Sequence, residues 1–287
     1  TYPVMGYVET LEACLSHPHY KAPLKKLQGR GYASGFWFNA GGESSAQVNI
    51  TEDGNVVVTT GHPDIGGSRA SIANITAELL GIDVNRVSVL IGDTATIGFS
   101  NLTGGSRVLF ASALVVTEST NQVIDILKDR ASKIWNIDKE AIEWENGEAR
   151  PAGDNAGKFK PLSLVELAEQ ATPTGGPIGA GHQVNTVGAE GGFATHICDV
   201  EVDIELGIAR IIRYTAAQDV GKAIHPAYVE GQLQGGVVQG IGWALNEEYI
   251  YNKEGKLDNP GFLDYRIPVC SDLPMIDTIL VEVPNPK

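Results

Sequence analysis

The residues best suited to chemistry lie between Asp219 and Glu248, where glycine recurs inside an expected helix that has Pro226 near its start. Its glycines are Gly231, Gly235, Gly236, Gly240 and Gly242. Each would cost about 1 kcal/mol relative to alanine in an exposed helix. Dense glycines are tolerated where another group must approach the backbone more closely than a Cβ allows. The stretch is therefore either a tightly packed core helix or one wall of a binding site.

Three glutamines, Gln232, Gln234 and Gln239, share this stretch. A buried amide both donates and accepts hydrogen bonds, and it needs partners for both functions. A polar ligand rich in phosphate, carbonyl and ring nitrogen would supply them. The alternative is that the glutamines simply face water.

Two further glycine-rich stretches each lead from an expected strand into an expected helix. The first contains Gly66, Gly67, Ser68 and Arg69, and the second contains Thr103, Gly104, Gly105 and Ser106. The start of a helix offers unpaired backbone N–H groups and the positive end of the helix dipole, which suit a phosphate or another anion. The guanidinium of Arg69 would add a charge-assisted contact. The two loops are expected to converge on one extended ligand, although each also fits an ordinary strand-to-helix turn.

Several motifs of the central stretch resemble the second molybdopterin-binding region of the xanthine oxidase family of molybdenum hydroxylases. They are Asp219-Val-Gly, Ile224-His225-Pro226, Glu230-Gly231-Gln232 and Gly236-Val-Val-Gln239-Gly240-Ile-Gly242. Both glycine-rich loops also resemble pterin-binding segments of this family, and the resemblance extends over nearly the whole chain.

The resemblance implies a molybdenum-molybdopterin cofactor, expected in its cytosine dinucleotide form. Gln232 and Gln239 are seven residues apart, so they fall close to one helical face and are the expected cofactor-facing side chains. His225 is expected near the dinucleotide. Two positions depart from the family: Gly67 stands where most relatives have glutamine, and Val108 stands where serine or threonine is common. Backbone contacts with the cofactor are compatible with both changes, whereas the family's side-chain contacts are not assigned at these two positions.

The implied activity is the hydroxylation of an aromatic N-heterocycle, nicotinate-like or purine-like, with water as the source of oxygen. Electrons would leave through iron–sulfur clusters to FAD. Cys14, Cys198 and Cys270 are far apart and form no cluster-binding pattern. The expected partners are therefore an iron–sulfur subunit, a FAD subunit and a subunit carrying the first molybdopterin-binding half.

This chemistry needs a glutamate as general base within hydrogen-bond reach of the reacting group. Glu190 and Glu230 are the carboxylates nearest to glycine-rich segments, but neither matches the family's catalytic motif. No catalytic residue is therefore expected in this chain, and the base is expected beyond Lys287. A non-catalytic scaffold or maturation protein, or a subunit of a related aldehyde or carbon monoxide dehydrogenase, stays an alternative. A free-standing hydrolase or transferase is disfavoured because no Ser-His-Asp pattern or phosphate-binding lysine motif is present.

Composition narrows the class of protein. The 287 residues are 43% hydrophobic and 20% charged, as in globular domains, and their net charge of −14 disfavours nucleic acid as a partner. No signal peptide or membrane-spanning run is recognised, so the cytoplasm is the expected location and no membrane is expected as a partner. His17 and His19 are expected in a surface loop and not in a metal site.

The elements that must position these residues are predicted from periodicity. Residues 46–50 and 56–60 form a hairpin around Asp53-Gly54, and residues 193–204 and 208–217 form another. Residues 172–192 are rich in glycine, proline and threonine and are typical of a boundary or long loop. The predicted fold is α+β, with two interleaved lobes and mostly antiparallel sheets. The first lobe, residues 1–185, holds both glycine loops, and the second, residues 186–287, holds the later hairpin and the glycine- and glutamine-rich helix.

Overall fold

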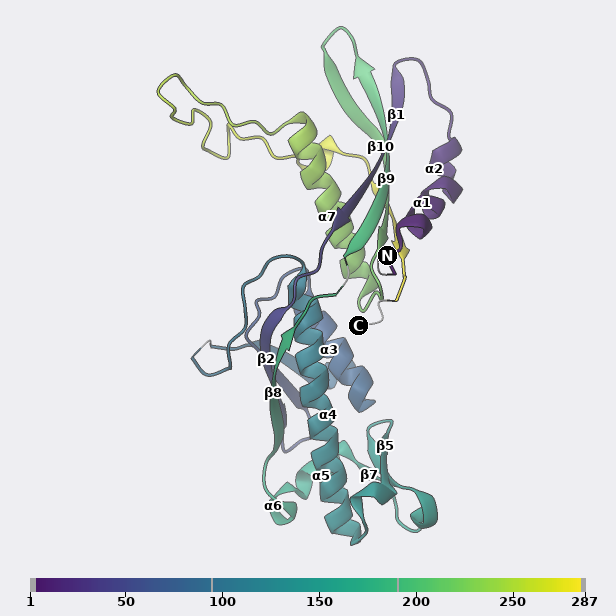
Figure 1. The fold of residues 1–287 in the computed structure, drawn as a ribbon, viewed down its shortest axis with the longest axis vertical. Helices are drawn as coiled ribbons and strands as arrows, with labels where there is room; N and C mark the ends of the chain where they lie inside the picture. The colour runs from purple at the N-terminus through teal and green to yellow at the C-terminus, as the bar shows by residue number, and fades with distance from the viewer. Residues whose placement is uncertain (1–3, 94, 190, 285–287) are drawn as a thin grey trace. The chain divides into compact units, whose positions relative to one another are not determined.

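The computed structural model describes residues 4–93, 95–189 and 191–284, and its contacts divide the chain into two compact units. The inserted unit comprises residues 39–189, and the outer unit combines residues 1–38 with residues 190–287. Each unit contains both helices and a β-sheet (Figure 1). The predicted α+β fold with interleaved lobes is confirmed.

The inserted unit is built on a four-stranded sheet in the order β4-β3-β2-β8. Its strands are β2 (Gly42–Ile50), β3 (Val56–Thr60), β4 (Val87–Ile91) and β8 (Ile178–Thr186). β2 pairs antiparallel with β3 and β8, and only β3 and β4 run parallel. The predicted hairpin forms because Gly54 adopts a positive φ of 73° at the turn.

Two helices pack on this sheet, α3 (Ser68–Leu80) and α4 (Arg107–Trp135). α4 buries Val116, Val123 and Leu127 completely, at the spacing of one helical face. Val56 and Val58 alternate inward from β3 and meet the same core. The loops predicted to bind a cofactor precede these two helices, so the packed core fixes where both loops emerge.

A smaller sheet completes the inserted unit. β5 (Ile142–Glu145) and β6 (Glu148–Pro151) form a hairpin through Asn146 and Gly147, whose φ angles of 51° and 77° suit a two-residue turn. The remaining elements are β7 (Leu162–Ser163), α5 (Leu164–Glu169), α6 (Ala171–Thr174) and the 3₁₀ turns η1 (Val84–Arg86), η2 (Lys139–Ala141) and η3 (Gly153–Asn155).

The outer unit has its own four-stranded sheet in the order β1-β9-β10-β11. Its strands are β1 (Gln28–Trp37), β9 (Gly192–Asp203), β10 (Ile208–Asp219) and β11 (Ile276–Val281). β9 and β10 form the second predicted hairpin, and β11 is parallel to β10. Most strand pairs in the chain are antiparallel, as predicted.

Helices cover both faces of the outer sheet. α1 (Tyr7–Ser16) packs with Ala217 of β10, whereas α7 (Pro226–Leu245) packs with the adjacent Ala216. Successive side chains of a strand point to opposite faces, so α1 and α7 lie on opposite sides of the sheet. A short α2 (Pro18–Lys21) follows α1, and η4 (Cys270–Asp272) precedes β11.

Two sequence-based expectations need correction. Residues 1–38 belong to the outer unit and not to the first predicted lobe, because β1 pairs with β9 from Gln28 opposite Glu201 to Trp37 opposite Gly192. The predicted boundary at 185 and 186 is close to the observed junction at 189 and 190. His19 does not lie in a surface loop, because it is only 2% exposed in α2 and contacts Asp199 at 3.1 Å.

Within the described ranges, no helix is long and apolar enough to cross a membrane. Histidine, cysteine and carboxylate side chains of those residues also form no cluster of three or more that would hold a metal ion.

Candidate functional site

α7 has one packed face and one open face. Val237 and Ile241 pack with Ala216 and Ile276 of the sheet. On the opposite side are four glycines where a Cβ would meet no atom of the described residues within 4 Å: Gly231, Gly235, Gly236 and Gly240. At Gly242 a Cβ would be only 2.7 Å from Cδ of Pro268. Among the five glycines of α7, close packing against the described residues therefore accounts only for Gly242.

The three glutamines of α7 lie on different faces of the helix. The side-chain amide of Gln234 donates to the carbonyl oxygen of Ile276 at 3.3 Å, so it ties the helix to β11. Gln232 and Gln239 are exposed and share the open side with the glycines. We call Gln232, Gly235, Gly236, Gln239 and Gly240 the open face of α7.

His225 occupies the N-cap position of α7 without a side-chain capping bond, and its ring stacks on that of Tyr228, with centroids 4.0 Å apart and planes 12° from parallel. Its Nδ1 atom is buried and has no hydrogen-bond partner among the described residues. The stacking fixes the orientation of the ring, and the buried nitrogen retains an unused hydrogen-bonding function beside the first turn of the helix.

Most polar groups of the first glycine loop form hydrogen bonds or ion pairs with neighbouring residues of the same loop. Gly66 and Gly67 adopt positive φ angles of 63° and 76° and lead into α3. The Ser68 hydroxyl accepts from the N–H of Ile65 at 3.3 Å, and the N–H of Arg69 donates to the Asp64 carboxylate at 3.1 Å. The Arg69 guanidinium is also paired with Asp64 at 3.3 Å. An anion at this helix start would have to compete with the carboxylate of Asp64.

The second glycine loop is more open. Gly105 and Ser106 adopt successive positive φ angles of 59° and 54°, and α4 begins after them without a side-chain cap. The carbonyl oxygen of Gly105 accepts from the N–H of Ala40 at 2.7 Å. The backbone N–H groups of Thr103, Gly104, Gly105 and Ser106 have no acceptor among the described residues. Such a run of free N–H groups at a helix start is a concave binding site for an anion.

Arg107 directly follows the second glycine loop and was not among the site residues predicted from the sequence. Its side chain is buried, and its guanidinium contacts both the loop before α4 and the start of β2. Its position directly after Gly105-Ser106 was visible in the sequence. The backbone carbonyls that it binds were not visible there, because they belong to a separate strand and to a turn.

Ser44 links the two glycine loops inside the inserted unit. Its hydroxyl is 2.6 Å from Nε2 of His62, which precedes the first loop, and 3.5 Å from Nη2 of Arg107 at the end of the second. Burial and then the positive charge of Arg107 lower the pKa of His62 to about 4. A neutral histidine ahead of the first loop and the arginine after the second loop therefore contact the same serine hydroxyl.

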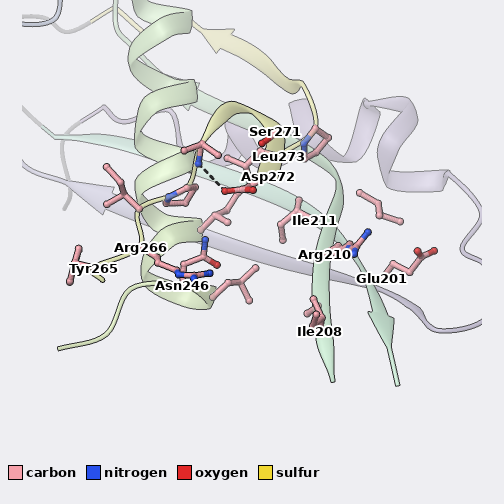
Figure 2. Close-up of a pocket in the computed structure, with 18 of the residues that line it drawn as sticks. Glu201, Ile208, Arg210, Ile211, Asn246, Tyr265, Arg266, Ser271, Asp272 and Leu273 are labelled. Carbon is pink, nitrogen blue, oxygen red and sulfur yellow. Dashed lines mark hydrogen bonds between the residues drawn. The ribbon is translucent and has the colours of Figure 1, made fainter. Parts of the chain in front are cut away.

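A cavity of about 1040 Å³ lies in the outer unit, between β10, the end of α7 and residues 262–274 (Figure 2). Its lining includes Glu201, Arg210, Arg266 and Asp272. It contains none of the predicted cofactor-binding residues and lies at the opposite end of α7 from His225. The open face of α7 and the second glycine loop therefore remain the better candidates for the cofactor.

The residues present fit a large polar cofactor. The open face of α7 gives close access to a helix backbone and two free amides, and the second loop gives unpaired N–H donors for an anionic group. Each unit by itself therefore presents groups that suit part of an extended polar cofactor.

Comparison with known proteins identifies the family. The molybdopterin cofactor-binding domain family matches residues 17–274. The xanthine dehydrogenase molybdenum-binding subunit of Escherichia coli O157:H7 is 29% identical over 269 residues, which cover 89% of this chain and 35% of that protein. The nicotine 6-hydroxylase large subunit of Paenarthrobacter nicotinovorans is 28% identical over 251 residues, which cover 84% of this chain and 30% of that protein. The chain belongs to the molybdopterin cofactor-binding domain family, that of the molybdenum-binding subunits of the xanthine oxidase family.

Solved structures agree with this assignment. The quinoline 2-oxidoreductase of Pseudomonas putida 86 superposes with a TM-score of 0.80 at 26% identity, covering 97% of this chain and 37% of that one. A copper- and molybdenum-containing carbon monoxide dehydrogenase has a TM-score of 0.81 at 21% identity and shows the shared fold. The chain spans about a third of the length of these relatives.

Proposed function

We propose that this chain is the molybdopterin-binding portion of a molybdenum hydroxylase that adds oxygen from water to an aromatic N-heterocycle, nicotinate-like or purine-like. The open face of α7 carries this proposal, because it offers backbone access and two amides that nothing else in the described residues occupies. Relatives named for xanthine and nicotine, and a structural relative named for quinoline, support a heterocyclic substrate.

Each part of the site has a distinct task in this proposal. Gln232 and Gln239 would donate to and accept from the polar edge of the cofactor, while the glycines between them allow its close approach. The N–H groups of Gly105 and Ser106 would hold an anionic part of it, and His225 would lie near the dinucleotide. When bound, the molybdenum cofactor supplies the redox chemistry, and the protein positions it.

The first loop would contribute less. Gly66 and Gly67 offer backbone groups only, because Gly67 has no side-chain amide. Ser68 is turned into its own loop, and Arg69 would first have to leave Asp64. We therefore assign Thr103, Gly104, Gly105 and Ser106 the main anion contact and the first loop a supporting one.

The general base is proposed to lie outside residues 1–287. Glu230 is exposed on the first turns of α7, and Glu190 lies outside the described residues. A general base contributes typically about 10²- to 10⁴-fold to a rate. Glu230→Gln and Glu190→Gln should each change kcat of the assembled enzyme by less than about tenfold, and a loss of about 10³-fold with molybdenum intact would move the base into this chain.

The remaining assignments complete the proposal. The cofactor is proposed in its cytosine dinucleotide form. The partners are proposed to be a subunit with the first molybdopterin-binding half, an iron–sulfur subunit and a FAD subunit, with the complex in the cytoplasm. Nicotinate dehydrogenase, whose molybdopterin region is divided between two chains, is the proposed type of assembly.

Paired glutamine variants of the assembled enzyme test the proposal. Gln239→Ala removes an amide from the open face and should lower molybdenum and pterin content while leaving the unfolding temperature unchanged. Gln234→Ala is the matched control on the packed face, and it should lower stability instead because it removes the bond to Ile276. Unchanged cofactor content and turnover in Gln239→Ala would remove that residue from the site.

A substrate panel separates the remaining alternatives. An aldehyde oxidase from Oryza sativa subsp. japonica is also 29% identical to this chain, so an aldehyde is the second candidate substrate. Turnover of nicotinate or hypoxanthine, with ¹⁸O from labelled water in the product, supports the proposal. Turnover of aldehydes alone favours the second candidate, and a complex without molybdenum or pterin favours a scaffold or maturation role.

A further inference from the structure

The guanidinium of Arg107 is bound to backbone carbonyls on two separate segments. Nε donates to the carbonyl oxygen of Gly41 at 2.6 Å, and Nη2 donates to that of Glu43, also at 2.6 Å. Nη1 donates to the carbonyls of Asn101 and Leu102 at 3.0 and 3.2 Å. The side chain thus joins the start of the second glycine loop to the first residues of β2.

This arrangement closes the loop into a ring, because Arg107 follows its last residue and binds the carbonyls at its beginning. Asn101 strengthens the closure, since its N–H donates to the Glu43 carbonyl at 3.0 Å and its amide donates to the Glu43 carboxylate at 2.8 Å. With both ends fixed, Gly105 and Ser106 are held in their left-handed conformations and their N–H groups stay unpaired.

Burial lowers the pKa of the Arg107 guanidinium, and the Glu43 carboxylate is the nearby negative charge that acts against this shift without forming a direct ion pair. The side chain is 2% exposed, and no ion pair joins it to a carboxylate among the described residues. Its hydrogen-bond acceptors are neutral oxygens, which satisfy the N–H groups without cancelling the charge. A positive charge therefore lies beneath a loop of free N–H donors, where it favours a bound anion.

We propose that Arg107 is a positioning residue that holds residues 101–106 in their anion-binding shape and supplies the positive charge beneath them. This inference rests on the proposed function, because it assigns the loop to an anionic part of the molybdopterin cofactor. Arg107 does not need to touch the cofactor. It acts through the backbone of the loop.

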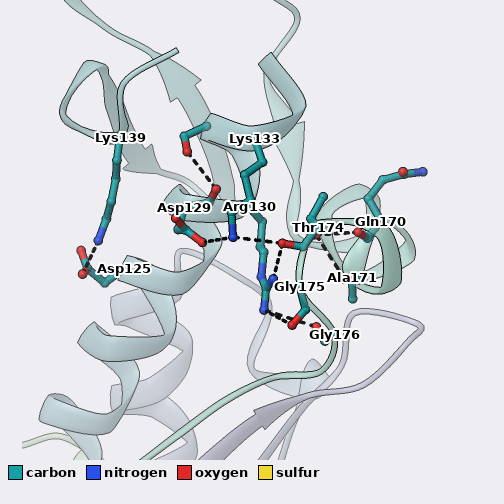
Figure 3. Close-up of polar contacts among 11 residues, drawn as sticks. Asp125, Asp129, Arg130, Lys133, Lys139, Gln170, Ala171, Thr174, Gly175 and Gly176 are labelled. Atoms are coloured by element: carbon teal, nitrogen blue, oxygen red, sulfur yellow. Dashed lines mark hydrogen bonds and ion pairs between the residues drawn. The ribbon is translucent and has the colours of Figure 1, made fainter. Parts of the chain in front are cut away.

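Arg130 provides a matched control on the same helix (Figure 3). It is 7% exposed, and it also donates to backbone carbonyls: to Thr174, and to Gly175 at 3.0 Å. It lies five helical turns or more beyond the glycine loop, near α6. Arg107 and Arg130 are therefore equivalent as structural arginines and differ in whether a cofactor loop depends on them.

The experiment compares Arg107→Met, Arg107→Lys, Arg130→Met and Arg130→Lys in the complete enzyme complex. Molybdenum and oxidised pterin are measured per folded complex, together with the unfolding temperature. Residues that orient a binding group typically contribute about 10- to 100-fold. We expect Arg107→Met to retain about tenfold less cofactor than wild type. Arg107→Lys should be intermediate because it restores the charge without the planar fork. The Arg130 variants should lose stability but keep the cofactor.

Hydrogen exchange of the cofactor-free complex tests the loop independently of cofactor content. Faster exchange at residues 101–106 in Arg107→Met, but not in Arg130→Met, supports the positioning role. Unchanged exchange there, cofactor retention like that of wild type, or equal cofactor loss in the Arg130 variants overturns it. Wild-type complex without molybdenum or pterin would instead refute the proposed function, and the exchange result would still decide whether Arg107 positions the loop.

Discussion

Replacing Gly236 by alanine is expected to stabilise the chain alone and to weaken the assembled enzyme. A glycine inside a helix costs about 1 kcal/mol relative to alanine. At Gly236 the new Cβ meets no described atom within 4 Å, so no steric cost offsets the gain. The free energy of unfolding should rise by about 0.5 to 1 kcal/mol, which is roughly a two- to fivefold change in the folding equilibrium.

Gly242→Ala is the control in the same helix. It brings the same gain in helix propensity, but its Cβ would lie 2.7 Å from Cδ of Pro268 and would also press on the Glu247 carboxylate. Overpacking of this kind typically costs about 1 to 3 kcal/mol. The variant should therefore be less stable than wild type or equal to it.

Urea unfolding of the chain alone, followed by circular dichroism, gives the first measurement. Molybdenum and pterin content of the assembled complex gives the second, and there Gly236→Ala should fall below wild type because its methyl group projects from the open face of α7. A Gly236→Ala chain that is destabilised as Gly242→Ala is would contradict the first expectation. Full cofactor content in the assembled Gly236→Ala complex would contradict the second.

Three further outcomes are expected. His62 has a pKa near 4 when folded and 6.5 when unfolded, so the unfolded chain takes up a proton first as the pH falls. The free energy of unfolding should therefore fall by roughly 3 kcal/mol between pH 6.5 and pH 4. Urea unfolding at a series of pH values should show a smaller fall for His62→Asn. Asp199→Asn should cost about 3 to 5 kcal/mol in urea unfolding, because it leaves the buried Arg30 guanidinium without its carboxylate. Ser163→Ala should cost about 1 kcal/mol, and NMR titration should show the Glu166 pKa rising from about 2, because the substitution removes a hydroxyl of the capping box.

Local pattern predicted most of the elements. Asp53-Gly54 marks a hairpin because its turn needs the positive φ that Gly54 adopts. The partner of β1 could not be predicted in this way. Its residues Gln28–Trp37 pair with β9, which follows the inserted unit in the sequence. The local pattern of these residues does not indicate a partner so many residues away.

The candidate site was predictable where residue type and helical spacing sufficed. Gln232 and Gln239 share a face with the glycines of α7, and Gln234 falls on the other side, as a period of 3.6 residues requires. Arg107 and His19 were not predictable, because their roles depend on acceptors contributed by other elements. Arg107 needs the carbonyls of Gly41 and Glu43, and His19 needs the carboxylate of Asp199.

The antiparallel pairing of β1 with β9 has a consequence for biosynthesis. Trp37 lies opposite Gly192, so the chain leaves the outer sheet and returns to it at neighbouring positions, with all of residues 39–189 made in between. On the ribosome, the inserted unit is contiguous and can fold as soon as it emerges, whereas β1 must wait for β9 with an unpaired edge. A nascent chain stalled before β9 is therefore expected to hold a folded inserted unit and an incomplete outer sheet, the stage at which unpaired strand edges favour aggregation.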